Sequence, residues 1–457
     1  MTEKHEFARG FALLVAATSF MELLDGTIIQ TALTQIGSDL GVSVSASALA
    51  MSAYFAAVAA TIPLTAWFAD KYGVRNSFVA GIALFTLVSI LCGTSVSFTE
   101  LLIFRILQGF GGAVMINVGQ LSILRSTPKK HLLRATAYLI WPALAAPVLA
   151  PPIGGIITDT LGWRWLFFIN IPIGLIAVLL ASRLAPKQDP DGGHVKKLDV
   201  AGALLLATGL FALIPALSLV EFANNPIRLL AIAFGIAMVV TAAVWMLRAK
   251  APLLDLRLYA INTYRAGNAS GALYRAAVGT APVILTLMFQ SSFNWSAAHA
   301  GLMVMWLFVG NIAIKPLANY AVRTYGFKRV IVVATTVGAS TLALSSLLTA
   351  RISFIELAAL LVLSGAARSV AFTAYASLQY SDVPAHQMSS ANPLSGTVQQ
   401  IASSLGIAVF VGSLSIFNRG VENPLAFKVI LVAMSLCLLA STYGAFRLPK
   451  HAGHKVG

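Results

Sequence analysis

Two acidic residues, Glu22 and Asp25, lie three positions apart inside an apolar run near the start of the chain. Residues with this spacing share one face of a helix. Burial disfavours the charged form of a carboxylate, and a second carboxylate nearby disfavours it further, so such a pair can exchange protons near neutral pH. We expect Asp25 and Glu22 to carry protons or bind substrate. The alternative is a paired structural acid, or an acid at an aqueous helix end.

Three basic residues, Arg275, Lys315 and Arg368, lie inside apolar runs of the second half, where no acid lies at comparable depth. A cavity with acids on one side and bases on the other suits an anionic or zwitterionic substrate, because arginine binds carboxylates through paired hydrogen bonds. The alternative is snorkelling or pairing with carbonyl groups. Asn170 and Gln399 are polar residues that line the same cavity or, equally, join helices.

The composition indicates which kind of secondary structure holds these residues. Of 457 residues, 58% are hydrophobic and 10% charged, against about 25% charged in a soluble domain, which excludes a water-soluble enzyme. Unbroken apolar runs exclude barrel strands, which alternate, and each run is long enough for a transmembrane helix. We predict an all-α polytopic membrane protein with fourteen spans, at about 11–33, 45–68, 76–96, 100–123, 132–157, 165–184, 198–219, 227–247, 264–289, 298–319, 328–349, 353–376, 388–414 and 424–446.

The distribution of basic residues predicts the orientation. With both termini in the cytoplasm, 22 of the 31 lysines and arginines fall in cytoplasmic segments and five outside, as the positive-inside rule requires. The net charge of +15 is therefore a topology signal and does not indicate nucleic-acid binding. The first run resembles a signal peptide at its start, but Glu22 and Asp25 interrupt it, so we expect a retained helix.

The chain repeats itself. Residues 69–75 (ADKYGVR) recur loosely as 322–328 (VRTYGFK), at an offset of 253 residues that also relates the first span to the ninth. We predict a six-helix bundle at 1–184, a cytoplasmic linker with two inserted helices at 185–263, and a second six-helix bundle with a short tail at 264–457. Duplicated bundles around a midplane cavity are typical of secondary transporters.

Several motifs give the chain a resemblance to a known family. It resembles the major facilitator superfamily, and within it the fourteen-span drug:proton antiporter branch (EmrB/QacA-like), over nearly its whole length. The matching positions are Ala66 to Arg75 for GxLaDrxGrk; Leu101, Arg105, Gln108, Gly109 and Gly111 for LxxxRxxQGxG; Pro151, Gly154 and Gly155 for gxxxGPxxGG; and residues 163–174 with Asp199 and Gly202 for branch signatures.

The resemblance implies roles for single residues near the start of the chain. Asp25 falls in the family's LDxT pattern, which supports a role in proton coupling, and Arg105 is implied to act with a nearby acid, although a buried strut for carbonyl groups is the alternative. Asp70, Gly73 and Arg75 are implied to form a gating loop that latches the two bundles, against a plain topology-setting turn.

The resemblance also bears on the fifth span and on the glycines. Pro151, Gly154 and Gly155 are implied to bend the fifth span at the bundle interface, against passive packing. Gly109, Gly111 and Gly112 more naturally allow close helix packing than substrate contact.

These observations together predict a proton-coupled antiporter that exports small organic molecules, of the multidrug efflux type, by alternating access. Alternatives are an exporter of an anionic metabolite, such as an organic acid or an iron chelate (a siderophore complex), and a non-transporting membrane sensor. No Walker A loop, HExxH pair or nucleophile elbow indicates an enzyme, and with two cysteines no metal or cofactor motif appears. The resemblance implies the bacterial inner membrane and a monomer, open to an accessory export protein, with protons, the lipid bilayer and a small-molecule substrate as partners.

Overall fold

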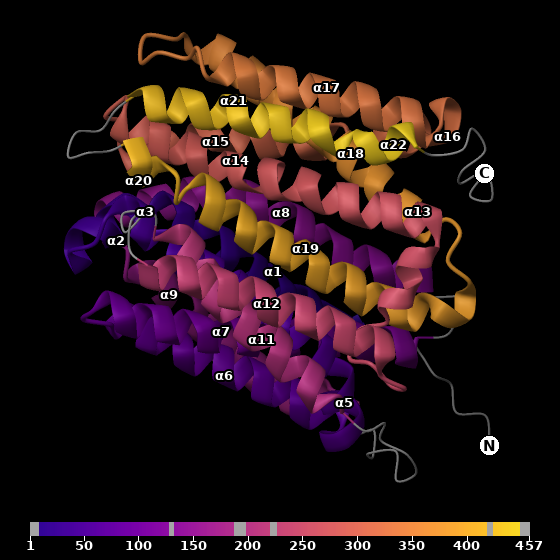
Figure 1. Cartoon of the computed structure of the whole chain (residues 1–457). Helices are drawn as coiled ribbons and strands as arrows, with labels where there is room; N and C mark the ends of the chain where they lie inside the picture. Colours follow the sequence, from indigo (N-terminus) through magenta and orange to yellow (C-terminus); the bar gives the residue numbers. More distant parts are fainter. Residues whose placement is uncertain (1–8, 128–131, 187–197, 220–225, 418–423, 448–457) are drawn as a thin grey trace.

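The computed structural model describes residues 9–127, 132–186, 198–219, 226–417 and 424–447. Within these ranges the chain forms helices joined by short turns, and no strand occurs in them. The long helices run side by side, and both ends of the chain lie at the same end of the bundle (Figure 1). We call the opposite end the far end.

Six long helices from the first half of the chain pack together, and we call them the N-terminal group. Within it α1 contacts α7, α8 and α10, α6 contacts α7 and α10, and α4 contacts α7. Its members are α1 (Arg9–Ile28), α4 (Leu49–Thr61), α6 (Val74–Thr94), α7 (Phe98–Ser126), α8 (Leu132–Thr160) and α10 (Asn170–Leu184), with short helices η1 (Ile29–Thr31), α2 (Leu33–Leu40), α3 (Val44–Ser47), η2 (Ile62–Leu64), α5 (Thr65–Tyr72) and α9 (Trp165–Phe168) between them.

Six long helices from the second half form the C-terminal group. Here α14 contacts α15, α19 and α21, while α18 contacts α15 and α17. Its members are α14 (Gly271–Ser291), α15 (Ala297–Ala313), α17 (Phe327–Ser345), α18 (Phe354–Tyr380), α19 (Met388–Phe410) and α21 (Pro424–Ser441). The short elements are η5 (Leu256–Ala260), α13 (Asn262–Arg265), the π-helical turn η6 (Ala266–Ser270), α16 (Lys315–Tyr325), η7 (Ala385–Gln387), α20 (Leu414–Phe417) and α22 (Tyr443–Phe446).

Helices occupy all fourteen of the predicted spans. Twelve helical segments of the described chain are long and apolar enough to cross a membrane, and the bent pair of α15 and α16, with a 48° break, makes a thirteenth. The remaining predicted span, at 132–157, coincides with α8, which is 29 residues long and continuous through its prolines. The all-helical membrane fold is confirmed, whereas the count of fourteen stays a prediction.

The inserted helices α11 (Val200–Ser218) and α12 (Pro226–Arg248) pack against each other, and α11 also contacts both α4 and α19. In Figure 1 they lie in front of α6 and α7, next to α19. Asp199 holds the pair together, since its carboxylate accepts hydrogen bonds from the backbone of Gly202 and Leu253 and from the indole of Trp245. The Asp199 and Gly202 signature therefore caps α11 and fastens the chain that follows α12.

The repeat seen in the sequence has a structural counterpart. Gly73 joins α5 to α6, and Gly326 joins α16 to α17, each with a positive φ, of 80° and 77°. Only glycine adopts such a backbone conformation readily. The same sharp turn therefore occurs in both halves at the repeat offset.

The two groups touch along two seams, α8 against α15 and α4 against α19. Hydrogen bonds between the groups, among the residues that the structure describes, all lie toward the far end. They join Asp159 to Ala297 and Ala298, Gln290 to Thr31 and Thr34, and Ser404 to Ser52. The structure is therefore a conformation that is closed at the far end.

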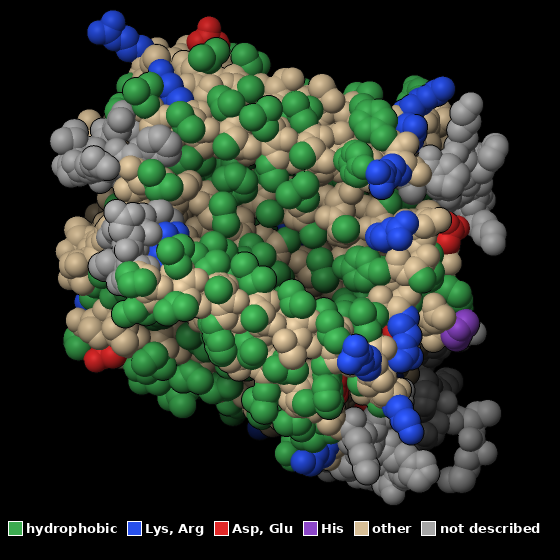
Figure 2. Space-filling view, viewed as in Figure 1, with side chains coloured by type: hydrophobic (Ala, Val, Ile, Leu, Met, Phe, Trp, Pro, Cys, Tyr) green, Lys and Arg blue, Asp and Glu red, His purple; other side chains and the backbone are tan. Residues whose placement is uncertain are grey.

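The face seen in Figure 2 is largely apolar along the middle of the helices. Lysine and arginine side chains gather on this face at the end where both chain termini lie (Figure 2). An apolar belt with basic residues at one end is the pattern expected of a protein that spans a lipid bilayer.

Candidate functional site

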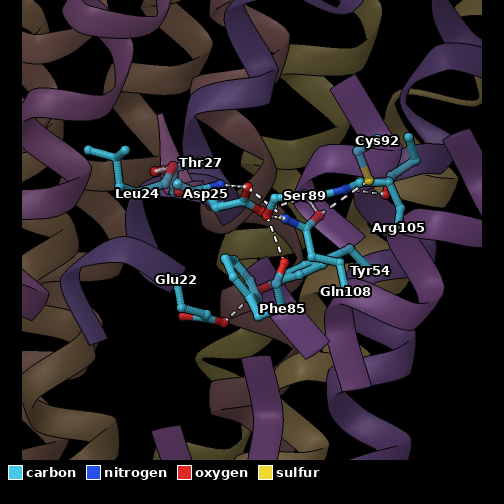
Figure 3. Close-up of polar contacts among 12 residues, drawn as sticks. Glu22, Leu24, Asp25, Thr27, Tyr54, Phe85, Ser89, Cys92, Arg105 and Gln108 are labelled. Carbon is cyan, nitrogen blue, oxygen red and sulfur yellow. Dashed lines mark hydrogen bonds and ion pairs between the residues drawn. The ribbon is translucent and has the colours of Figure 1, made fainter. Parts of the chain in front are cut away.

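A buried polar network surrounds Asp25 in the middle of the N-terminal group. The Arg105 guanidinium donates to Asp25 Oδ2 at 2.6 Å, while the amides of Gln108 and Asn170 donate to Oδ1 at 3.1 and 2.8 Å. The ion pair is fully enclosed, with side-chain exposures of 0% and 1%. Three donors thus engage the Asp25 carboxylate, and Arg105 is its ion-pair partner (Figure 3).

Side chains from four helices form this network, and Gln108 makes two further hydrogen bonds within it. Asp25 comes from α1, Arg105 and Gln108 from α7, and Asn170 from α10. Gln108 also donates to Ser89 Oγ of α6 at 2.8 Å and accepts from Arg105 at 2.6 Å. These hydrogen bonds link α1, α6, α7 and α10 directly.

The fifth helix, α4, enters through Tyr54. The ring of Tyr54 lies under the Arg105 guanidinium, with the Cζ atom 4.2 Å from the ring centroid. The hydroxyl of the same tyrosine donates to Glu22 Oε1 at 2.9 Å. Tyr54 therefore contacts both the arginine of the ion pair and the second acid, on opposite parts of one side chain.

Glu22 has a different environment from Asp25. It is buried, with 6% exposure, and among the described residues it forms no ion pair; its hydrogen bond comes from a neutral hydroxyl. Protonation of Glu22 breaks no ion pair, whereas protonation of Asp25 leaves Arg105 without its counterion. Of the two acids, Glu22 is the one that can change charge at the smaller cost.

Glycines of α7 allow this close arrangement. A Cβ atom on Gly112 would stand 3.0 Å from Tyr54 Oη and 3.2 Å from Glu22 Cγ, and one on Gly109 would stand 2.6 Å from the Tyr54 carbonyl oxygen. A Cβ on Gly111 would stand 2.8 Å from the Phe85 amide of α6. The glycines expected from the sequence to permit close packing do so here, and Gly112 in addition borders Glu22.

The three basic residues of the second half lie within the C-terminal group. The Arg275 and Arg368 guanidinium groups both approach the Phe372 ring, with Cζ atoms 4.4 and 5.4 Å from its centroid. Lys315, at the break between α15 and α16, donates to Thr373 Oγ1 at 3.2 Å. The two arginines are thus brought together, and the lysine contacts the same helix about one turn from Arg368.

The polar residues expected to line the substrate cavity separate in the structure. Gln399 borders a pocket that Arg275 also lines. Asn170 does not join them: it is fully buried and donates to Asp25, because α10 packs against α1. The expectation that Asn170 belongs to the cavity is therefore wrong in this conformation, and Asn170 is part of the acid–arginine network.

The proposed gating loop forms an ion pair within one group. Asp70 accepts from Arg125 of α7 at 2.9 Å, with both side chains well exposed. This ion pair joins α5 to the end of α7. In this conformation it therefore connects two helices of the N-terminal group and does not bridge the two groups. Arg75 is partly exposed and forms no ion pair among the described residues.

The motif in α8 lies at the seam between the groups, and whether it bends the helix during transport stays a prediction. A Cβ atom on Gly155 would collide with the Ala297 carbonyl of α15, and one on Gly154 would stand 2.7 Å from Thr31 Oγ1. The Pro151 carbonyl in turn occupies the space beside Gly301 of α15. These small residues let α8 and α15 approach at backbone distance toward the far end.

Three members of the network have no assigned role in the sequence-based prediction. Gln108 stands in a matched motif, and its spacing of three from Arg105 on one helix is a signal that it shares a face with the arginine. Tyr54 and Ser89 carry no such signal, because each is one of many similar residues in an apolar run, and only the packing of α4 and α6 on α7 brings them to the site.

Apolar helices around a buried acid–arginine pair are typical of membrane proteins with an ion or substrate pathway. Residues 15–274 match the family model described as the Major Facilitator Superfamily. The chain belongs to this superfamily, a family of transporters, and it is a multi-pass membrane protein and not an enzyme.

Relatives named as multidrug resistance proteins are similar in sequence over most or all of the chain. The chain is 33% identical over 468 residues to the "Putative multidrug resistance protein MdtD" of Escherichia fergusonii, covering 100% of this chain and 98% of the relative. It is also 33% identical over 423 residues to the protein of the same name from Shigella sonnei, covering 92% and 88%.

Solved structures share the fold. The nucleoside transporter NupG, solved as a point mutant, superposes with a TM-score of 0.67 at 14% identity, covering 96% of this chain and 100% of that one. The inward-open xylose transporter XylE from E. coli gives a TM-score of 0.65 at 13% identity, covering 97% of both chains. At this identity the likeness concerns the fold alone.

Proposed function

We propose that the chain is a proton-coupled antiporter of the multidrug efflux type, which exports small organic molecules by alternating access. The observation that carries the proposal is the pair of acids with unequal partners: Asp25 is locked to Arg105, and Glu22 is held only by the Tyr54 hydroxyl. Intramembrane charges are expensive and mark ion or substrate pathways. The relatives named as multidrug resistance proteins supply the substrate class.

In the proposed cycle Glu22 exchanges the proton and Asp25 with Arg105 transmits the change. Tyr54 connects them, because its hydroxyl binds Glu22 while its ring packs on the guanidinium. A proton on Glu22 removes the acceptor charge that orients this hydroxyl, and the Tyr54 ring then moves against Arg105. The network reaches α1, α4, α6, α7 and α10, so the response is a movement of the whole N-terminal group.

The two groups are the proposed moving units, which correspond to residues 1–184 and 264–457 with the insert between them. The hydrogen bonds at the far end, of Asp159 with α15 and of Gln290 with Thr31 and Thr34, must break when that end opens. With the termini in the cytoplasm, the far end faces the outside and this conformation faces inward. The gating loop at Asp70, Gly73 and Arg75 is proposed to bridge the groups only in the opposite conformation.

The proposed setting is the bacterial inner membrane, with both termini cytoplasmic. One chain holds both groups and all residues of the network, which supports a working monomer. Its partners are the proton, the lipid bilayer and a small-molecule substrate, and an accessory export protein would extend the path beyond this membrane.

The test is transport by the purified full chain in proteoliposomes. With the membrane potential clamped at zero, an imposed pH gradient should drive rhodamine 123 across the membrane in the direction opposite to the protons, and a protonophore should abolish the movement. A protein that binds the dye but never accumulates it under a pH gradient would overturn the proposal in favour of a non-transporting sensor. Liposomes without protein control for passive dye movement.

A further inference from the structure

The C-terminal group contains two guanidinium groups without a counterion. Arg275 of α14 and Arg368 of α18 lie over the same ring, Phe372, and neither forms an ion pair in the described part of the chain. The Nε atoms of both arginines are buried without a hydrogen-bond partner, and Arg368 donates one hydrogen bond, to the Val278 carbonyl at 3.3 Å. This contrasts with Arg105, whose charge Asp25 neutralises.

No acid of this group is near enough to supply the missing charge. The described acids from residue 264 onward are Glu356, in the first turn of α18, and Asp382, just after its last turn. At 1.5 Å of rise per residue, they stand about 18 and 21 Å along the helix from Arg368. Glu356 is moreover engaged in the capping box with Ser353.

The contacts that exist compensate the two charges only in part. The Phe372 ring is shared between two cations, which repel each other, and Arg368 also lies 5.4 Å from the centroid of the Phe308 ring. A carbonyl oxygen supplies a dipole and no net charge. Uncompensated cations within a membrane protein face a cavity or a substrate path. The arrangement is therefore incomplete until an anionic group enters it.

A small pocket, about large enough for one water molecule, lies beside Arg275; Arg368 is not among its lining residues. It is bordered by Phe372, Asn268, Gln379 and Gln399, of which the Asn268 amide is already hydrogen-bonded to Tyr259 and Ser395. Gly279, one turn along α14 from Arg275, has open space on its Cβ side. The pocket extends from Arg275 toward the end of the molecule where the termini lie, which no hydrogen bond between the groups closes among the described residues.

The wall of this pocket carries a local irregularity. Residues Ala266–Ser270 form a π-helical turn immediately before α14, and Gly267 there packs directly against the Gln379 backbone. Single π-turns interrupt the regular hydrogen bonding of a helix and occur frequently at functional sites. The sequence resemblance and the relatives give no role to this turn or to the residues around it.

We propose that Arg275 and Arg368 form an anion clamp that binds the acidic group of the exported molecule. The ligands are amphipathic organic anions, whose carboxylate or sulfonate meets the two guanidinium groups and whose apolar part packs on Phe372. Two guanidinium groups from different helices offer several N–H donors to one carboxylate. The clamp rests on the proposed export function and narrows its substrate class within multidrug-type efflux.

The test compares two dyes with one xanthene frame and opposite charge, the anion fluorescein and the cation rhodamine 123. Binding to the purified full chain is measured by fluorescence polarisation, together with proton-driven transport in proteoliposomes. The variants are Arg275→Gln and Arg368→Gln. The control is Arg228→Gln, an arginine that bonds a carbonyl oxygen of α11 far along the chain from the clamp.

In the clamp, loss of either arginine weakens fluorescein binding about 10- to 100-fold, the range of one charge-assisted hydrogen bond, and leaves rhodamine 123 binding within about twofold. Because each substitution removes a repelling charge, the ligand-free melting temperature stays level or rises. Arg228→Gln changes neither dye. Arg275→Lys, which keeps the charge and loses the planar fork, gives an intermediate loss for fluorescein.

Three results would overturn the clamp: equal fluorescein binding by wild type and both variants, a parallel loss of both dyes, or a fall in ligand-free melting temperature that marks the arginines as structural struts. If a pH gradient still drives rhodamine 123 export while neither substitution changes fluorescein binding, the clamp fails and the proton-coupled function stands. If fluorescein binding needs both arginines but no dye is driven by protons, the clamp stands and the proposed coupling fails.

Discussion

Replacement of Glu22 by glutamine separates proton coupling from folding more cleanly than any other change in the network. Glutamine has the same shape, and its Oε1 still accepts the hydrogen bond from Tyr54, so one neutral hydrogen bond of about 1 kcal/mol replaces a charge-assisted one. A buried charge without an ion-pair partner disappears at the same time. We therefore expect the free energy of unfolding of Glu22→Gln to stay within about 1 kcal/mol of wild type.

Transport should respond far more strongly. A gradient of two pH units supplies roughly 2.7 kcal/mol per proton, which supports about a 100-fold accumulation of a neutral substrate exchanged for one proton. If Glu22 is the exchanging acid, the accumulation ratio of the variant falls to about 1, while exchange of labelled for unlabelled substrate at equal pH continues. Retained exchange shows that the binding site and the movement of the groups are intact.

The assay uses the full chain in proteoliposomes with the membrane potential held at zero by valinomycin and equal potassium on both sides. The matched control is Glu356→Gln, an exposed acid at the start of α18 whose capping hydrogen bonds glutamine can also make. The control should accumulate substrate as wild type does. A Glu22→Gln protein that still accumulates substrate close to 100-fold would refute the assignment of Glu22.

Further predictions test the neighbours of this acid and the seam between the groups. Asp25→Asn should abolish proton-driven transport and, because it leaves Arg105 charged and buried, lower the free energy of unfolding by about 3–5 kcal/mol. The double variant Asp25→Asn/Arg105→Gln should recover most of this stability but no transport. A stable Asp25→Asn protein with proton-driven transport would contradict both the structural and the coupling role of Asp25. Gly112→Ala should reduce transport at least tenfold in the same assay with little change in the free energy of unfolding, since its Cβ would press on Tyr54 Oη at 3.0 Å. Transport at the wild-type rate would show that this contact does not affect transport. Asp159→Ala should speed hydrogen–deuterium exchange at the first turn of α15, where Asp159 accepts two backbone hydrogen bonds at 3.1 and 2.7 Å, and unchanged exchange would mean that the far end is closed without it.

Several features of this molecule follow from local properties of the chain. Apolar runs of about 20 residues must become helices in a bilayer, because no water is present to satisfy the backbone. The helices therefore appear at all fourteen predicted runs. The turns at Gly73 and Gly326 follow from the repeated loop, and the paired positions of Glu22 and Asp25 follow from the helical period.

Other expectations failed or stayed open because they depend on which helices pack against each other. By residue type and spacing alone Glu22 and Asp25 are similar acids. In the structure α7 and α10 supply three donors to Asp25, while α4 supplies a single hydroxyl to Glu22. Asn170 was assigned to the cavity, and the packing of α10 on α1 places it in the ion-pair network instead. Asp70 was expected to latch the groups, and its partner Arg125 lies on a helix of its own group.

The sequence by itself thus determined the membrane-embedded helical architecture, the duplication and the identity of the charged residues within the spans. Each of these depends on composition, spacing or period along one chain. Only the tertiary structure decided which acid is neutralised, which arginines are left without a counterion, and which end of the bundle is closed. Those properties depend on distances between side chains of different helices, which the period of each single helix leaves free.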